Sequence, residues 1–196
     1  MKTNEARFDL GFSSEEIPKS PHICLIYESE EQRRKIVSEY LIAGIKQKQM
    51  VRYFSDSTPS GEIIKWLEEA GVDVERLEKE GAFLIKDAEM AYCPHGHFNP
   101  PEVIESLKER YVIAEKSGFT GSRVSGEMSW ALRNIPGSER ILEYETLINS
   151  INVTFPHIGM CQYDARKFDG ATLFKVLQIH PFIIAQGQVV QNPYYQ

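Results

Sequence analysis

Short apolar segments alternate with longer helical patterns along this chain from residue 21 onward. The first segment, His22–Tyr27, is an almost continuous apolar run, typical of a strand buried on both faces of a parallel sheet. The next segment opens with a capping box, in which Ser29 is the N-cap and Gln32 stands three residues later. Apolar residues then recur on one helical face. This alternation is typical of β-α-β crossovers, so it predicts a mostly parallel sheet.

The same patterns divide the rest of the chain. We expect further strands at residues 51–55, 82–85, 122–126 and 157–163, each followed by a helix, and a closing strand pair at 181–185 and 188–191. Thr58 and Ser138 are the expected N-caps of the second and fourth helices. Residues 87–98 are expected to form a loop. A chain of 196 residues suits one large domain, and no repeat or linker divides it. We therefore expect a three-layer α/β domain over residues 21–196, preceded by a polar N-terminal leader, residues 1–20.

Charge and cysteine content narrow the class of protein. The formal net charge is −6, which disfavours direct nucleic-acid binding because phosphate backbones favour concentrated Lys and Arg. No apolar run approaches the length of a membrane span, and the first 20 residues lack the apolar core of a signal peptide. The three cysteines are too few for a disulfide framework. We expect a cytoplasmic protein with reduced thiols and no membrane partner.

Ligands of open parallel sheets bind beyond the carboxyl ends of the strands. We therefore consider the residues at or just after the predicted strand ends to be the candidate ligand-binding residues: Tyr27, Glu28, Asp56, Glu127, Met128, Trp130, Tyr163 and Asp164. Acidic groups beside large apolar side chains suit a binding pocket. The alternative is that the acids cap helices and the aromatic rings complete the core.

The turn after the first strand argues against ATP. A phosphate-binding loop needs the pattern Gly-x-x-x-x-Gly-Lys-Ser/Thr, and the sequence contains no such string. The turn reads Tyr-Glu-Ser-Glu-Glu over residues 27–31, and its carboxylates would repel a polyphosphate. ATP bound in the standard pose is therefore not expected. Glu127 would then hydrogen-bond to a ligand, to Arg123 or to Arg133. The alternative is a divergent ATPase in which Glu127 serves as the active-site acid.

Two groups of cysteine and histidine residues are candidates for a metal site or for a catalytic nucleophile. Cys93, His95 and His97 are zinc-ligand types, but a fourth ligand would come from Cys161 or His180 only if the fold brought one near. A metal-dependent sensor is therefore a further alternative. Cys161 lies about 13 Å from His157 by strand geometry, too far for a local Cys–His nucleophile. We expect no catalytic residue, no metal and no cofactor.

A set of short motifs in a fixed order resembles a known family. The motifs are His22–Glu28, Arg123–Leu132, Glu143–Glu145, Cys161–Asp164, His180–Pro181 and Asn192–Tyr195. Together they resemble the MEDS family, the methanogen/methylotroph sensory domain, from about residue 21 to the end of the chain.

The resemblance implies a RecA-like fold, similar to that of P-loop NTPases but with a degenerate P-loop, and a non-enzymatic sensory role in signal transduction or transcriptional regulation. It also implies recognition of a small hydrocarbon derivative, since the family includes a dichloromethane-responsive transcriptional regulator. Members are often joined to DNA-binding domains or histidine kinases. This chain is therefore expected either to act through a separate partner of one of those kinds or to have another output. Homodimers are expected by analogy with RecA-like domains. In this hypothesis Tyr27, Trp130 and Tyr163 form the pocket walls, and Glu28, Glu127 and Asp164 orient the ligand.

Overall fold

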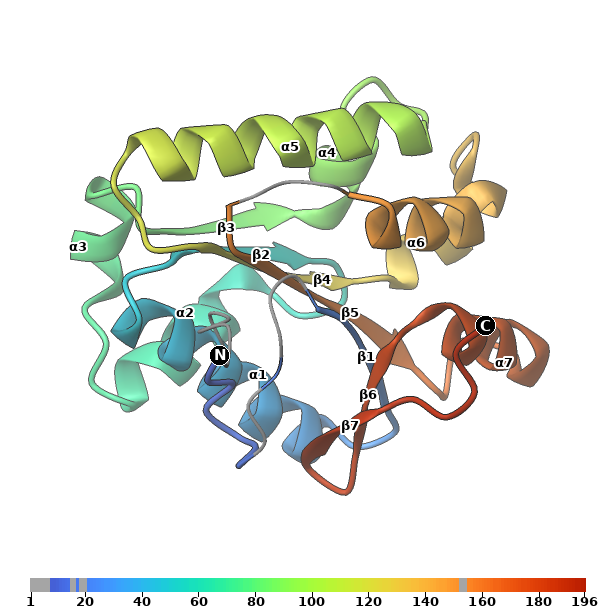
Figure 1. Ribbon diagram of the computed structural model, residues 1–196, viewed down its shortest axis with the longest axis horizontal. Coiled ribbons are helices and arrows are strands. Elements are labelled where there is room, and N and C mark those ends of the chain that lie inside the picture. Colours follow the sequence, from blue (N-terminus) through green and yellow to red (C-terminus); the bar gives the residue numbers. More distant parts are fainter. Residues whose placement is uncertain (1–7, 15–16, 18–20, 152–154) are drawn as a thin grey trace, which may run out of the picture.

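A computed structural model describes residues 8–14, 17, 21–151 and 155–196. In this part of the chain seven strands form one sheet in the order β3-β2-β4-β5-β1-β6-β7 (Figure 1). Neighbouring strands are parallel except β6 and β7, which are antiparallel. The strands are β1 (His22–Tyr27), β2 (Met50–Ser55), β3 (Phe83–Asp87), β4 (Ser122–Glu127), β5 (His157–Asp164), β6 (Phe182–Ala185) and β7 (Gln188–Gln191). The predicted mostly parallel sheet is confirmed.

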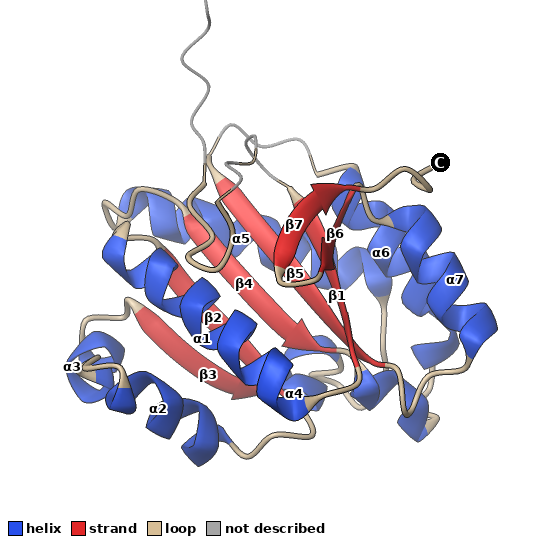
Figure 2. Cartoon of the chain, turned by 90° about the horizontal axis from the view of Figure 1, so that it is seen from below, coloured by secondary structure: helices blue, strands red, loops and turns tan. Residues whose placement is uncertain are grey.

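Helices cover both faces of the sheet and make three layers (Figures 1 and 2). One face packs against α1 (Glu30–Lys46), α2 (Ser60–Glu69) and α3 (Val74–Lys79). The other packs against α4 (Ala88–Tyr92), α5 (Pro100–Lys116), α6 (Ile141–Asn149) and α7 (Gly170–Ile179). Two 3-10 turns, η1 (Ser129–Arg133) and η2 (Ser138–Arg140), join β4 to α6. We call the two sides of the sheet the α1 face and the α5 face.

Local chemistry explains most helix starts and the last turn. The Ser29 side chain accepts a hydrogen bond from the Gln32 N–H, and Asp169 does the same for Thr172 at the start of α7. Between β6 and β7, Gln186 and Gly187 both have positive φ, at 51° and 75°. Two such residues in a two-residue loop match the type I′ turn that joins twisted antiparallel strands.

Three element predictions were wrong in detail. The predicted loop at 87–98 contains α4, because the Asp87 side chain accepts from the Met90 N–H and starts a helix. The helix expected to begin at Ser138 begins at Ile141, after the 3-10 turn η2. Thr58 does not cap α2, which begins at Ser60. Its hydroxyl instead accepts a hydrogen bond from Arg33.

The N-terminal segment is described in part. Phe8, Leu10 and Ile17 are buried on the α1 face, and Phe8 and Ile17 form an antiparallel bridge. The Asp9 carbonyl accepts hydrogen bonds from Arg123 and Gln47, both at 2.8 Å. The described residues of this segment therefore pack on the domain, and its boundary at residue 21 stays a prediction.

The described helices include none that is both long and apolar enough to cross a membrane.

Candidate functional site

Glu127, at the end of β4, is the centre of a buried polar network on the α1 face. Its Oε2 accepts hydrogen bonds from the backbone N–H groups of Asp56, Ser57 and Thr58, at 3.2, 2.6 and 3.1 Å. Its Oε1 accepts from Tyr53 at 2.7 Å and from Arg33 at 3.1 Å. The side chain is 1% exposed. Five donors use the capacity of this carboxylate, so it has no free oxygen to offer a ligand.

Arg33 of α1 supplies the positive charge of this network. Its guanidinium donates to Glu127, Tyr53, Gln162 and Thr58, and a fifth bond joins its Nε to Glu30 at 2.8 Å. Sequence reasoning offered a ligand, Arg123 or Arg133 as the partner of Glu127. The two arginine alternatives were wrong, because Arg123 lies at the start of β4 and donates to Tyr40 and Gln49, while Arg133 pairs with Asp56 and Glu89.

The remaining acidic candidates have partners of their own or lie outside. Asp56 accepts from Ser129 at 2.8 Å as well as from Arg133. Asp164 accepts from Arg166 through both carboxylate oxygens, and these bonds hold its pKa below the usual value. Glu28 is exposed. Tyr27 is buried, with its ring centroid 5.1 Å from the Arg33 guanidinium carbon.

The other three candidates lie on the opposite side of the sheet. Met128, Trp130 and Tyr163 are fully buried in the core of the α5 face. Trp130 stacks on Tyr92 with ring centroids 5.0 Å apart, and Phe98 packs against its edge at 4.8 Å. The structure therefore does not bring these side chains together with Tyr27, Glu28 and Glu127 as walls of one pocket.

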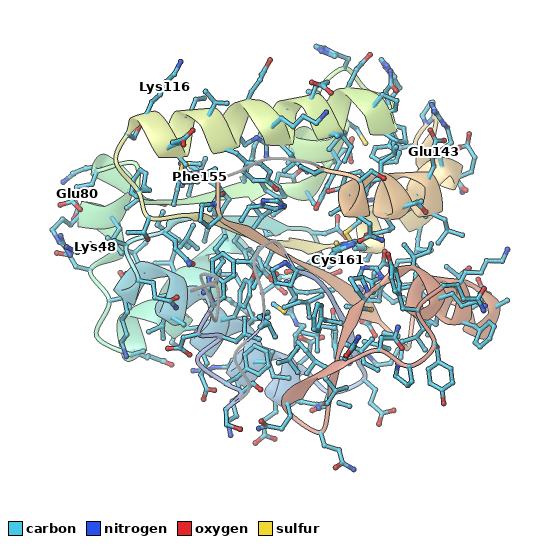
Figure 3. All side chains as sticks on the ribbon, viewed as in Figure 1. Lys48, Glu80, Lys116, Glu143, Phe155 and Cys161 are labelled. Carbon is cyan, nitrogen blue, oxygen red and sulfur yellow. The ribbon has the colours of Figure 1, made fainter. Side chains whose placement is uncertain are left out.

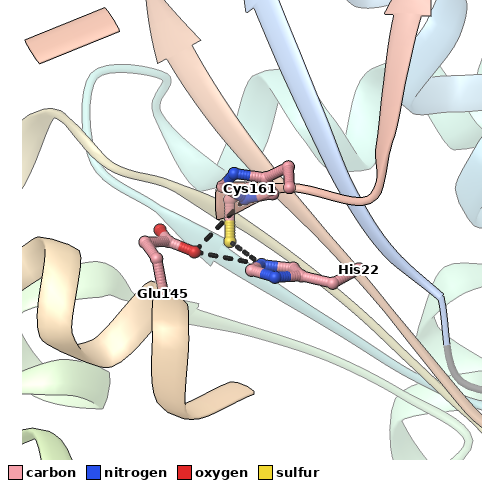
Figure 4. A group of neighbouring side chains, drawn as sticks. His22, Glu145 and Cys161 are labelled. Atoms are coloured by element: carbon pink, nitrogen blue, oxygen red, sulfur yellow. Dashed lines mark hydrogen bonds and ion pairs between the residues drawn. The ribbon is translucent and has the colours of Figure 1, made fainter. Parts of the chain in front are cut away.

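A second buried polar group, which we call the inner cluster, consists of His22, Glu145, Cys161 and His180. One ligand-type atom of each residue lies within 4.8 Å of all the others. Glu145 Oε2 is 3.0 Å from His22 Nε2 and 3.3 Å from His180 Nε2, and His22 Nε2 is 3.4 Å from Cys161 Sγ. Figure 4 shows His22, Glu145 and Cys161 pointing toward one another from β1, α6 and β5.

Burial shapes the ionisation of the inner cluster. Burial and the nearby His180 lower the pKa of His22. Burial and the Glu145 charge raise the pKa of the Cys161 thiol well above its usual value. Burial alone would raise the pKa of Glu145, but the two histidines outweigh it and the net shift is downward. Tyr163 donates a hydrogen bond to Glu145 Oε1, so Oε2 is left facing the histidines.

Sequence reasoning named all four of these residues among its motifs without placing them together. Strands β1 and β5 are neighbours, and His22 stands opposite Gly159, two residues from Cys161. Strand order decides this proximity, and periodicity within one strand does not reveal it. One signal was present: Glu145 falls on the helical face of Ile141, Tyr144 and Ile148, where a carboxylate is expected only if paired.

Cys93, His95 and His97 do not converge in the same way. Cys93 is buried, and burial together with Glu89 raises the pKa of its thiol to about 11. His95 and His97 lie exposed on the loop, with ring centroids 6.3 Å apart. Neither Cys161 nor His180 joins them, and within the described residues the converging donors are those of the inner cluster.

A small cavity of about 30 Å³ adjoins the inner cluster on the α5 face. His22 and Cys161 line it on the cluster side, and three tyrosines, Tyr92, Tyr111 and Tyr144, contribute from the helices. Gly126 and Gly159, which have no side chains, line the cavity on the sheet side. Figure 3 shows Cys161 inside the molecule, while Lys48, Glu80 and Lys116 project from its surface.

The strand order and the two helical layers define a RecA-like α/β protein. A KaiC-like protein from Pyrococcus horikoshii superposes with a TM-score of 0.62 at 16% identity, over 91% of this chain and 79% of that one. The flagellar accessory protein FlaH from Methanocaldococcus jannaschii gives a TM-score of 0.63 at 14% identity, over 95% and 84%. At these identities the similarity shows the fold alone.

The sequence itself shows the family. Residues 21–181 match the model of MEDS, the methanogen/methylotroph, DcmR sensory domain, and the chain belongs to this family. The transcriptional repressor DcmR from Methylorubrum extorquens is 30% identical over 182 residues, which are 91% of this chain. The match spans 62% of the repressor's length. The resemblance found in the motifs is thereby confirmed, and a sensory role in regulation is supported.

Proposed function

We propose that this chain is a non-enzymatic sensory domain that binds a small, uncharged organic molecule in the cavity of the α5 face. The cavity itself is the observation that supports this most. A water-sized group needs about 10–15 Å³ of such space. A cavity of about 30 Å³ therefore suits a ligand of two or three heavy atoms, the size of a halogenated or methylated one-carbon compound.

The lining of the cavity favours an uncharged ligand. Aromatic and aliphatic side chains make most of the wall, so a charged group would lose its hydration without compensation. The polar side chains of the lining are His22, His157 and Cys161, besides the tyrosine hydroxyls, and none of them is a carboxylate, lysine or arginine that would pair with an ionic ligand. This places the proposed site on the opposite face of the sheet from Glu127, whose carboxylate is already saturated.

A ligand in this cavity would signal by favouring one arrangement of its walls over another. Tyr92 lines the cavity and stacks on Trp130, which belongs to η1. A displaced Tyr92 ring would move η1 and, through Ser129, its contact with Asp56. The DcmR relative is a transcriptional repressor, and we propose that this domain likewise serves a DNA-binding regulator or a histidine kinase.

Filling the cavity is expected to abolish ligand binding without unfolding the domain. A Cβ at Gly159 would lie 4.0 Å from His22 Cδ2, an ordinary contact, and Gly159 has no positive φ. Gly159→Ala should therefore fold normally and weaken binding of dichloromethane at least tenfold. Binding is followed by Trp130 fluorescence in a Trp66→Phe background, since the chain has two tryptophans.

Gly61→Ala is the matched control, because its Cβ would meet no atom within 4 Å and Gly61 lies in α2 on the other face. It should leave binding unchanged. Equal dichloromethane affinity in both glycine variants would rule out this cavity. If no uncharged one-carbon compound, halogenated or methylated, changes the fluorescence, the ligand class is wrong.

Mg-ATP is expected to leave the melting temperature unchanged. The surface groove beside the β1–α1 turn is lined by Glu30, Glu31 and Glu62, and its two arginines already pair with Glu127 and Glu69. A triphosphate there would meet net negative charge. A clear upward shift with Mg-ATP, lost in Glu127→Gln, would favour the nucleotide-binding alternative.

A further inference from the structure

We propose that His22, Glu145, Cys161 and His180 bind one divalent transition-metal ion, preferably zinc, as a closed site with four protein ligands. The four side chains come from β1, α6, β5 and the C-terminal end of α7. All four residues are at most 5% exposed. Such a site would hold α6 and α7 against the sheet beside the cavity.

The hydrogen bonds behind the two histidine rings fix the direction of their lone pairs. His180 Nδ1 lies 2.8 Å from the Val176 carbonyl, which can only accept, so this nitrogen carries a hydrogen. His22 Nδ1 lies 3.0 Å from Asn149 Oδ1. The Asn149 amide nitrogen donates to the Ile179 carbonyl, which fixes that amide orientation and makes His22 Nδ1 a donor too. In the neutral rings, both Nε2 lone pairs therefore face Glu145.

Without a cation this arrangement is poorly compensated. If one ring is neutral, its Nε2 lone pair faces a carboxylate oxygen at 3.0 or 3.3 Å with no hydrogen between them. If both rings are protonated, two positive charges lie in a buried site with ring centroids 4.0 Å apart, where they repel strongly. A divalent cation removes both difficulties, because it binds the lone pairs and the carboxylate at once.

Geometry and charge both suit zinc. Tetrahedral bonds of about 2.0–2.3 Å separate ligand atoms by roughly 3.3–3.7 Å. The closest separations here are 3.0, 3.3 and 3.4 Å. With Cys161 as thiolate and Glu145 as carboxylate, the two negative charges balance a divalent ion, so the buried site is neutral. A set of two imidazoles and a thiolate binds zinc in preference to magnesium or calcium.

The surrounding groups are those that orient metal ligands. Each imidazole donates a hydrogen bond from its Nδ1–H group to an oxygen acceptor, which makes Nε2 a better ligand. Tyr163 donates to Glu145 Oε1 and so directs Oε2 toward the histidines. These three contacts lie outside the proposed coordination shell and would serve the same purpose for any ion bound there.

The first test is the metal content of the full chain, purified without chelators. We expect about one zinc per chain by elemental analysis. Replacement by Co²⁺ should give intense visible d–d bands, typical of four-coordination, and a thiolate charge-transfer band in the near ultraviolet. Zinc X-ray absorption should show one sulfur and three nitrogen or oxygen neighbours.

Cys24 provides a matched control for Cys161. The two residues are register partners on β1 and β5, both are buried, and Cys24 is not in the inner cluster. Cys161→Ala is expected to lose the charge-transfer band and most of the zinc, whereas Cys24→Ala should keep both. If Cys24→Ala loses the band as fully as Cys161→Ala, the assignment of the ligand is wrong.

If Cys161→Ala does not fold, the spectra of the unaltered chain decide the question. A folded chain that holds less than one-tenth zinc per molecule and takes up no Co²⁺ would overturn the proposal. So would a Co²⁺ spectrum without the thiolate band. These measurements use no organic ligand, so they can fail or succeed independently of the dichloromethane experiment with Gly159→Ala.

Discussion

Replacing Arg33 by methionine is expected to destabilise the domain by about 3–5 kcal/mol. The variant removes the positive charge beside Glu127 and leaves its carboxylate buried, with the side chain 1% exposed. Three other residues, Tyr53, Gln162 and Thr58, lose a donor at the same time. The free energy of unfolding, from urea denaturation followed by circular dichroism, measures the effect.

The neighbouring Arg34 gives the control. It pairs with Glu69, and both side chains are about half exposed, at 50% and 47%. Exposed pairs contribute about 0–1 kcal/mol, so Arg34→Met should change stability by no more than that. If Arg33→Met were as stable as Arg34→Met, the network around Glu127 would not hold the α1 face together as its geometry indicates.

Gly137→Ala is expected to cost about 2–5 kcal/mol, because two penalties combine. Gly137 has a φ of 88°, in the left-handed region, and an added Cβ would lie 2.1 Å from the Phe98 carbonyl oxygen. Backbone atoms cannot move aside as a flexible side chain can. Phe98 must then shift, although its N–H donates to the Pro136 carbonyl at 2.8 Å and its ring packs on Trp130. Near-ultraviolet circular dichroism should report the loosened aromatic core.

Gly71→Ala separates the two penalties. Its φ is 82°, nearly the same, but no atom lies within 4 Å of the added Cβ. Only the backbone strain remains, which costs about 1–2 kcal/mol. Equal losses in the two variants would mean that the contact between residues 98 and 137 contributes nothing.

The sequence was sufficient to predict the elements that depend on local chemistry. The apolar run at 22–27 and the Ser29 capping box correctly predicted β1 and the start of α1. Helix α4 was missed because five residues give no periodicity, and only the Asp87 cap marks its start. Thr58 was predicted to be an N-cap because the local pattern does not reveal that its hydroxyl bonds to Arg33, 25 residues earlier in the chain.

The site was harder to predict, since side-chain direction depends on which strands are neighbours. Glu127 and Trp130 are three residues apart, yet one joins the polar network of the α1 face and the other the aromatic core of the α5 face. Because both lie at or just beyond the end of β4, the sequence suggested that they share one pocket. The inner cluster draws His22 and His180 from nearly opposite ends of the chain, and no local pattern encodes that meeting.

The spread of the inner cluster along the chain also bears on synthesis. A nascent polypeptide that has not yet emerged as far as His180 cannot assemble the group, although Glu145 and His22 are already present. The Glu145 carboxylate would then lack one of its two imidazole neighbours, that of His180. The α5 side of the sheet is therefore expected to mature late in folding, through long-range contacts that form slowly.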